Sequence, residues 1–111
     1  MGPIAVFLTG GTGYLGGELL RQLLASGYRV RMLARRASAA CPSAQVELVE
    51  GDLSDPNRLA DQIRGCRAVI HSAALVASWV PKEVEFYRTN VDGLRNVMAA
   101  SERAGVDTLV Y

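Results

Sequence analysis

Glycines near the start of the chain are the residues best suited to binding chemistry. Gly11, Gly13 and Gly16 form the motif G-x-G-x-x-G, and Gly10 with Gly13 and Gly16 forms an overlapping G-x-x-G-x-x-G. Because glycine lacks a Cβ, the chain can turn tightly there and a pyrophosphate can approach the main-chain amides. These amides would be the free N–H groups of a helix amino terminus, whose partial positive charge favours an anion. The motif therefore predicts a dinucleotide-binding loop, and a glycine-rich turn without a ligand is the alternative.

The residues about twenty positions further on indicate which dinucleotide is bound. A carboxylate there binds the ribose 2′-hydroxyl of NAD, whereas an arginine accommodates the 2′-phosphate of NADP. Arg35 and Arg36 stand at about this distance from Gly16, and no carboxylate is near them. The sequence favours NADP, with NAD as the alternative. If the two arginines have no role in binding, they are ordinary solvated surface residues.

The glycines lie between an apolar segment and an amphipathic one, as a dinucleotide loop requires. Residues 4–8 are apolar and have the length of a buried strand. The leucines within 15–24 fall on one face of a helix, which we expect to end at Gly27. Gly16 and Gly17 would each cost this helix about 1 kcal/mol relative to alanine. We therefore expect close packing against the sheet or a ligand at both positions.

The rest of the chain repeats the alternation of strand and helix. The further predicted strands are residues 29–34, 46–49 and 68–72, and the start of another at 108–111. Strands that are apolar throughout and alternate with helices predict a parallel sheet covered on both faces, which is part of a doubly wound α/β (Rossmann) fold. The length fits a single dinucleotide-binding domain over residues 1–111.

Two more helices are marked by their ends and by apolar spacing. Asp55 and Pro56 suit the N-cap and first residue of a short helix, in which Leu59 and Ile63 should face inward. A longer helix should end near Gly105. Apolar residues at spacings of three and four predict that one face of this longer helix is core or a subunit interface: Val84, Tyr87, Val91, Leu94 and Met98.

Composition limits the class of protein. Half of the 111 residues are hydrophobic, 21% are charged and the net charge is +1, which suits a soluble globular protein and argues against disorder. We expect neither a nucleic-acid nor a membrane partner, and a cytoplasmic location, since no signal peptide or spanning segment is recognisable. Cys41 and Cys66 lack the neighbours of a zinc site or a disulfide framework, so no metal is predicted.

Taken together, the motifs resemble those of a known family. They occur in the order and spacing of the extended short-chain dehydrogenases/reductases, also described as the NAD-dependent epimerase/dehydratase superfamily. Residues 73–76 with Trp79 and Pro81 are most similar to its dihydroflavonol-reductase-like branch and to farnesol dehydrogenases. The resemblance implies hydride transfer between a nicotinamide cofactor and a small alcohol or carbonyl substrate, with a nucleotide-sugar epimerase or dehydratase as the alternative. The motifs that carry it are residues 9–16, 51–55, 71–74 and 89–97.

The resemblance also implies a set of cofactor-binding residues on the loops that follow the strands. Arg35 would meet the adenosine ribose or its phosphate, and Asp52 and Leu53 would meet the adenine ring. Ala73 and Ala74 would border the nicotinamide ribose, at the switch point between the first and fourth strands. The residues implied around the pyrophosphate are Gly10, Thr12, Gly13, Tyr14, Leu15 and Gly16.

Three polar residues have a structural interpretation beside the functional one. Asn90, on the long helix, would help to hold the active site in such enzymes. Asp52 could instead be a turn residue that binds its own backbone. His71 is expected to be a packed or backbone-bonded imidazole rather than a catalytic base. In the family, the equivalent of the long helix often packs across a dimer, so a homodimer through this helix is a further expectation.

The proton-transfer residues of the family are not found. Its members use a tyrosine four positions before a lysine, with a serine or threonine, whereas the only lysine here is Lys82 and Ser78 stands four positions before it. We therefore identify no catalytic residue. The chain ends in an apolar segment, which predicts the amino-terminal part of a longer dehydrogenase that is inactive alone. A cofactor-binding module without catalysis, such as a redox-sensing regulator, is the alternative.

Overall fold

The computed structural model describes residues 3–11, 13–35, 44–72 and 88–111. The predicted strands and helices are present there, and their described ends differ from the predicted ones by at most two residues. The elements are β1 (Ala5–Thr9), α1 (Tyr14–Ala25), β2 (Arg29–Ala34), β3 (Val46–Glu50), α2 (Pro56–Ile63), β4 (Ala68–His71), the π-helical turn η1 (Arg88–Asp92), α4 (Gly93–Ala104) and β5 (Thr108–Val110).

All five strands form one parallel sheet in the order β3-β2-β1-β4-β5. The chain builds outward from β1 to β3, and then crosses back to place β4 on the other side of β1. In register, Leu8 of β1 lies opposite Met32 of β2 and Ile70 of β4. This order confirms the doubly wound fold and puts the switch point between β1 and β4, where such folds bind their ligands.

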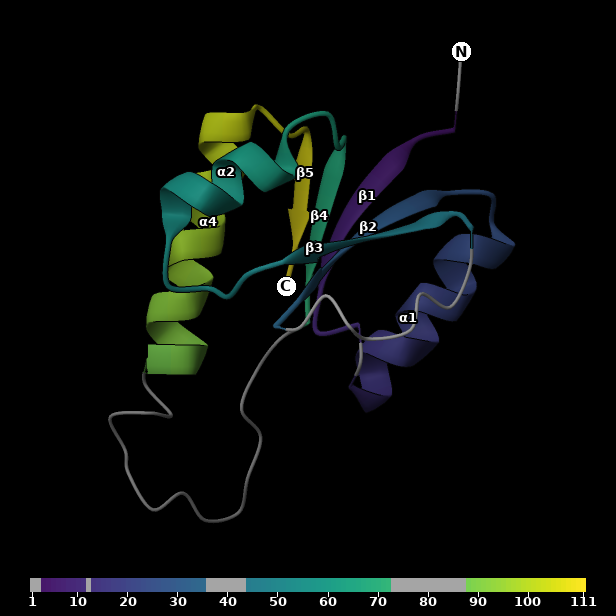
Figure 1. Cartoon of the computed structure of the whole chain (residues 1–111), viewed down its shortest axis with the longest axis horizontal. Coiled ribbons are helices and arrows are strands. Elements are labelled where there is room, and N and C mark those ends of the chain that lie inside the picture. Colours follow the sequence, from purple (N-terminus) through teal and green to yellow (C-terminus); the bar gives the residue numbers. More distant parts are fainter. Residues whose placement is uncertain (1–2, 12, 36–43, 73–87) are drawn as a thin grey trace.

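Helices lie on both faces of the sheet. α1 lies on one face, and α2 and α4 lie side by side on the other (Figure 1). The carboxyl ends of the strands all point to the same edge, because the strands are parallel. The turn after β1 and the loop after β3 therefore both open at that edge.

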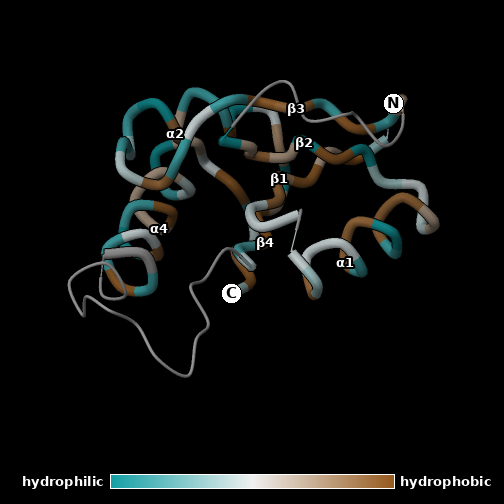
Figure 2. Tube along the Cα trace, turned by 60° about the horizontal axis from the view of Figure 1, so that its bottom comes forward, coloured by the Kyte–Doolittle hydropathy of each residue, from teal (hydrophilic) through white to brown (hydrophobic). Residues whose placement is uncertain are grey.

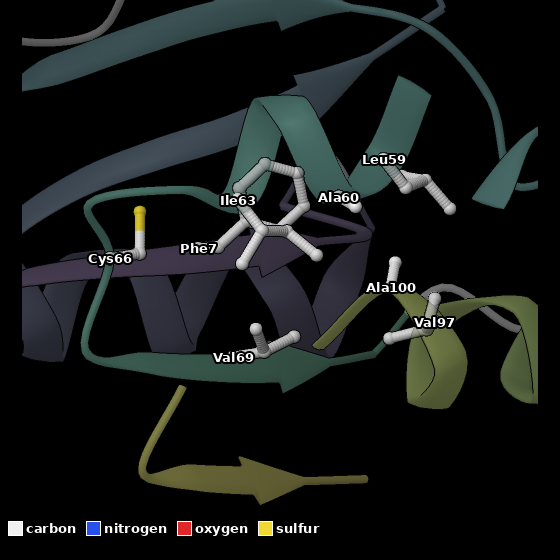
Figure 3. Close-up of a cluster of buried hydrophobic side chains, with 8 residues drawn as sticks. All are labelled: Phe7, Leu59, Ala60, Ile63, Cys66, Val69, Val97 and Ala100. Carbon is white, nitrogen blue, oxygen red and sulfur yellow. The ribbon is translucent and has the colours of Figure 1, made fainter. Parts of the chain in front are cut away.

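Each face has its own apolar core. Figure 2 shows hydrophobic residues concentrated along the central strands, while the helices alternate between hydrophilic and hydrophobic residues. Between α1 and the sheet lie Leu8, Leu20, Val30, Met32 and Val46. On the other face, side chains from β1, α2, β4 and α4 meet in one cluster: Phe7, Leu59, Ala60, Ile63, Cys66, Val69, Val97 and Ala100 (Figure 3).

The ends of α2 follow the predicted signals. The Asp55 carboxylate accepts hydrogen bonds from the amides of Asn57 and Arg58, both at 3.1 Å, and Pro56 occupies the first turn. Leu59 and Ile63 are completely buried, as expected. An aspartate at this position removes two unpaired donors from the start of the helix, and proline already has the required φ.

The long helix was predicted to turn one apolar face to the core or to a subunit interface. For the described residues Val91 and Met98, the core part of this prediction is wrong. Met98 is 50% exposed and Val91 is 36% exposed, whereas the buried positions of α4 are Gly93, Val97, Ala100 and Ser101. α2 packs directly against α4, and a close helix–helix contact favours small side chains over large ones. Val84 and Tyr87 lie outside the described residues, and the subunit interface stays a prediction.

No helix within the described parts of the chain is both long and apolar enough to cross a membrane.

Candidate functional site

The glycine turn after β1 is held by a close approach of backbone to backbone. Gly10 has a φ of +72°, in the region that only glycine adopts readily, and its carbonyl accepts a hydrogen bond from the Gly13 amide at 3.0 Å. A Cβ at Gly16 would lie 1.7 Å from the Gly10 carbonyl oxygen. The first turn of α1 therefore packs against the backbone of the glycine turn because Gly16 has no side chain.

Neither the backbone conformation nor the packing of the described residues requires a glycine at position 13. Its φ of −79° is open to any residue, it is exposed, and a Cβ there would meet Gly10 O only at 3.4 Å. It is also the N-cap of α1, and no described side chain caps this helix. The amides of the first turn are left for solvent or an anion, which is the arrangement that a bound pyrophosphate needs.

Gly17 differs from Gly16. A Cβ at Gly17 would come no closer than 3.9 Å to another residue, at the carbonyl oxygen of Gly11. Close packing is therefore present at Gly16, where the neighbour is the backbone of the glycine turn rather than the sheet, and absent at Gly17 among the described residues. Contact with a ligand remains a prediction for both.

Large side chains stand exposed beside the uncapped amides. Tyr14 is fully exposed and Leu15 is 64% exposed, although both belong to the first turn of α1. Their position agrees with a role in lining a ligand, and neither belongs to a core cluster of the described residues. The expectation that Leu15 shares the apolar face of this helix is therefore wrong. Thr12, predicted for the same loop, lies outside the described residues.

The loop between β3 and α2, residues 51–55, is named the adenine loop here because Asp52 and Leu53 are its predicted adenine contacts. Asp52 Oδ1 accepts hydrogen bonds from both the amide and the hydroxyl of Ser54, the first at 2.9 Å. These bonds, with the positive charges of Arg35 and Arg58, hold the pKa of the Asp52 carboxyl below its usual value. The turn interpretation of Asp52 is thus confirmed. Since both bonds use Oδ1, they leave Oδ2 for another donor.

Two arginines bring positive charge to the adenine loop. Arg35 is exposed directly after β2, where the NADP hypothesis needs it. Arg58, on the first turns of α2, donates from Nη2 to the Glu50 carbonyl at 2.8 Å. We did not predict Arg58 from the sequence, although its place three residues after the N-cap Asp55 puts it at the same edge of the sheet.

Hydrogen bonds join the carboxyl ends of β1 and β4 at the switch point. Thr9 Oγ1 and His71 Nδ1 are 2.7 Å apart, and the Ser72 hydroxyl donates to the Thr9 carbonyl at 2.6 Å. Burial lowers the pKa of His71, so the neutral imidazole is favoured. His71 is therefore packed, as predicted, but its partner is a side-chain hydroxyl rather than the backbone. Ala73 and Ala74, the next predicted contacts, lie outside the described residues.

Helix α4 adds a contact to the adenine loop that sequence reasoning missed. Asn96 Nδ2 donates to the Leu53 carbonyl at 2.7 Å across 43 residues of sequence. Asn96 belongs to one of the family-like motifs, but spacing alone gave it no role. Asn90, the predicted active-site residue of the same motif, lies in η1, just before α4 begins. Irregular π-helical turns of this kind are frequent at functional sites.

Comparison with known proteins settles the family. A sequence profile of the NAD dependent epimerase/dehydratase family matches residues 6–111. The chain belongs to this family. A Synechocystis sp. protein named as a dihydroflavonol 4-reductase is 40% identical over 107 residues, which are 95% of this chain and 31% of that protein. Sterol demethylase protein B of Methylococcus capsulatus is 38% identical over 110 residues, which are 97% of this chain and 34% of that protein.

Two solved structures share the fold of this chain. MoeE5, in complex with UDP-glucose and NAD, superposes with a TM-score of 0.80 at 32% identity, over 95% of this chain and 34% of MoeE5. The Bordetella bronchiseptica enzyme WbmG, in complex with NAD, gives a TM-score of 0.80 at 29% identity, over 96% of this chain and 36% of WbmG. The chain thus spans about a third of the length of the relatives it matches, and aligns with their amino-terminal third.

Proposed function

We propose that this chain is the NAD(P)-binding part of an oxidoreductase that transfers hydride between a nicotinamide cofactor and a small alcohol or carbonyl compound. The amino terminus of α1 carries the proposal. Gly16 lets the helix pack closely against the turn that follows β1, and Gly13 leaves the first-turn amides accessible. A pyrophosphate at this position would gain both the amide hydrogen bonds and the favourable helix dipole.

The adenosine half of the cofactor would lie along the ends of β2 and β3. Asp52 can accept a hydrogen bond from the adenine amino group through Oδ2, since its other oxygen is already engaged by Ser54. Arg35, exposed after β2, is the group we propose for the ribose 2′-phosphate of NADP. NAD in the MoeE5 and WbmG structures supports the dinucleotide, while the preference for NADP is our inference from Arg35.

The nicotinamide half would lie beside the end of β4, near Ala73, Ala74 and Asn90. When bound, the cofactor supplies the hydride acceptor or donor. This chain would hold the cofactor in place through the loops that follow its strands. Because the sequence has no tyrosine four residues before a lysine, we propose that the 111-residue chain binds the cofactor without turning over a substrate.

Titration of the chain with NADPH and NADH tests this function and its cofactor preference. We expect NADPH to bind more tightly. Arg35→Gln should weaken NADPH binding by about tenfold, the value of a hydrogen bond between charged groups, and leave NADH binding nearly unchanged. Arg29→Gln, an exposed arginine at the opposite end of β2, is the matched control and should change neither. A folded chain that bound neither nucleotide would refute the proposal.

A nucleotide-sugar epimerase or dehydratase is the second candidate, favoured by the UDP-glucose in the MoeE5 structure. Epimerisation returns the hydride to the same sugar, so it consumes no cofactor overall. A reductase consumes one NADPH for each carbonyl that it reduces. Measuring cofactor consumption by the protein that carries this domain together with its catalytic residues would therefore separate the two candidates.

A further inference from the structure

We infer that Asn96 is a positioning residue for the adenine side of the cofactor site, acting through the backbone of the adenine loop. The inference rests on the proposed function, because it assumes that Asp52 meets the adenine ring. Asn96 lies on α4. Its side chain donates to the carbonyl of Leu53, the residue next to Asp52, at 2.7 Å.

Other hydrogen bonds hold the two ends of the loop. The Gly51 amide extends the sheet by donating to the Ala34 carbonyl at 2.9 Å, and Asp55 caps α2 at the far end of the loop. Side chains of α2 donate to the Glu50 carbonyl, just before the loop. The middle of the loop is bonded to α4 through Asn96.

One peptide group transmits the effect of Asn96 to Asp52. The peptide between Leu53 and Ser54 contains the carbonyl that accepts from Asn96 and the amide that donates to Asp52 Oδ1. A peptide group is planar, so its C=O and N–H cannot turn independently. When Asn96 fixes the carbonyl, it also fixes the direction of the Ser54 amide, and with it the carboxylate that this amide holds.

Removing the Asn96 donor would release this arrangement. The Leu53 carbonyl would be free to rotate toward water, which turns the Ser54 amide away from Asp52 as the plane rotates. Leu53 would keep its apolar contacts, since its side chain packs against the buried cluster that β1, α2, β4 and α4 form. The loop would therefore stay in place while the orientation of the Asp52 carboxylate is lost.

The chain offers a matched control for the link between α2 and α4. Arg103 of α4 donates to the Asn57 side chain of α2, a second polar bond between the two helices. This bond is exposed and involves no backbone atom of the adenine loop. If such bonds acted only by holding the helices together, breaking either one would have the same effect on the site.

The test compares NADP with its hypoxanthine analogue, nicotinamide hypoxanthine dinucleotide phosphate, by calorimetric titration of the 111-residue chain. The analogue has a carbonyl oxygen where adenine has its amino group, so a correctly oriented Asp52 should disfavour it. We expect the native sequence to prefer NADP by about tenfold, the contribution of one hydrogen bond to a carboxylate. Asn96→Ala should reduce this preference several-fold, toward equal binding, whereas Asn57→Ala should keep it.

Each outcome has one meaning. Alanine has a higher helix propensity than asparagine, so Asn96→Ala should fold, which circular dichroism and thermal unfolding would verify. Asn96→Asp, which has the same size but lacks the NH₂ donor, should lose the preference in the same way. If Asn96→Ala discriminated between the nucleotides as well as the native chain does, or if the native chain bound both equally, the inference would be overturned. If the native chain bound neither, the proposed function itself would fail.

Discussion

The glycine turn and the adenine loop lie at the same edge of the sheet but are held by different means. In the turn, Gly16 meets the Gly10 carbonyl with no side chain between them. In the adenine loop, hydrogen bonds from several elements hold Asp52, Leu53 and Asp55. A structure that depends on an absent side chain should fail with one added methyl group. A structure that depends on several hydrogen bonds should weaken one bond at a time.

The largest effect is expected for Gly16→Ala. The new Cβ would lie 1.7 Å from a backbone oxygen, which cannot move aside as a flexible side chain could. Overpacking a tight site costs about 1 to 3 kcal/mol, and a clash with backbone should exceed this. We expect a loss of at least about 3 kcal/mol in the free energy of unfolding, together with loss of NADPH binding, measured by urea denaturation and by titration.

Gly17→Ala is the control for that variant. Its Cβ would lie 3.9 Å from the nearest atom, the Gly11 carbonyl oxygen, which is an ordinary van der Waals contact. Alanine also favours a helix over glycine by about 1 kcal/mol. The stability of this variant should therefore stay the same or rise. Its NADPH affinity separately tests whether the ligand needs a glycine there. If the two variants had equal stability, close approach would not be what holds the turn.

A smaller effect is expected at the far end of α2, where a strand side chain supports the helix. Arg31 of β2 donates from Nη1 to the carbonyls of Gln62 and Arg64, each at 2.7 Å, and its Nε pairs with Glu47 at 3.0 Å. Arg31→Met should lower the free energy of unfolding by about 2 kcal/mol, since hydrogen bonds from a charged group contribute about 1.5 to 3 kcal/mol and this one is partly exposed. Urea denaturation measures the change.

The companion variant Arg67→Met removes an arginine that pairs with Asp107, where both side chains are largely exposed. Such pairs contribute between about 0 and 1 kcal/mol, so its cost should be lower than that of Arg31→Met. Equal costs for the two variants would mean that the carbonyl bonds of Arg31 do not support α2. Neither variant should alter NADPH binding, because both residues lie away from the carboxyl edge of the sheet.

Local signals explain which parts of the fold could be predicted. The β2 range of 29–34 was predicted to the residue, and Asp55 with Pro56 marked the start of α2, because strand runs and helix caps depend on neighbours in sequence. The buried face of α4 could not be predicted this way. Its periodicity is compatible with a face of large residues that includes Met98 and with another that includes Val97 and Ala100. Tertiary contacts with α2 and the sheet bury the second face.

The same division applies to the candidate site. Gly10 and Gly16 could be identified from spacing, since a dinucleotide turn needs them at fixed separations. The supporting contacts of Arg58 and Asn96 could not, because a side chain that bonds a distant carbonyl leaves no periodic or spacing signal. Gly17 differs, since its type suggested close packing against the sheet or a ligand, and the described residues provide no close neighbour there.

The smallest expected effect concerns the switch point, where a partly buried hydrogen bond involves a group that titrates. Burial lowers the pKa of His71 from its ordinary value of 6.5, so the unfolded chain takes up a proton at a higher pH than the folded one. As the pH falls below about 6.5, the unfolded state therefore gains protons first, and the free energy of unfolding should decrease until the folded imidazole is also protonated.

His71→Gln removes this contribution. Its stability relative to the native chain should thus be lower at about pH 7.5, where Thr9 loses its imidazole partner, and the gap should narrow at about pH 5.5. Urea denaturation at the two pH values measures the gap, and a constant gap would show that the Thr9–His71 contact is indifferent to protonation.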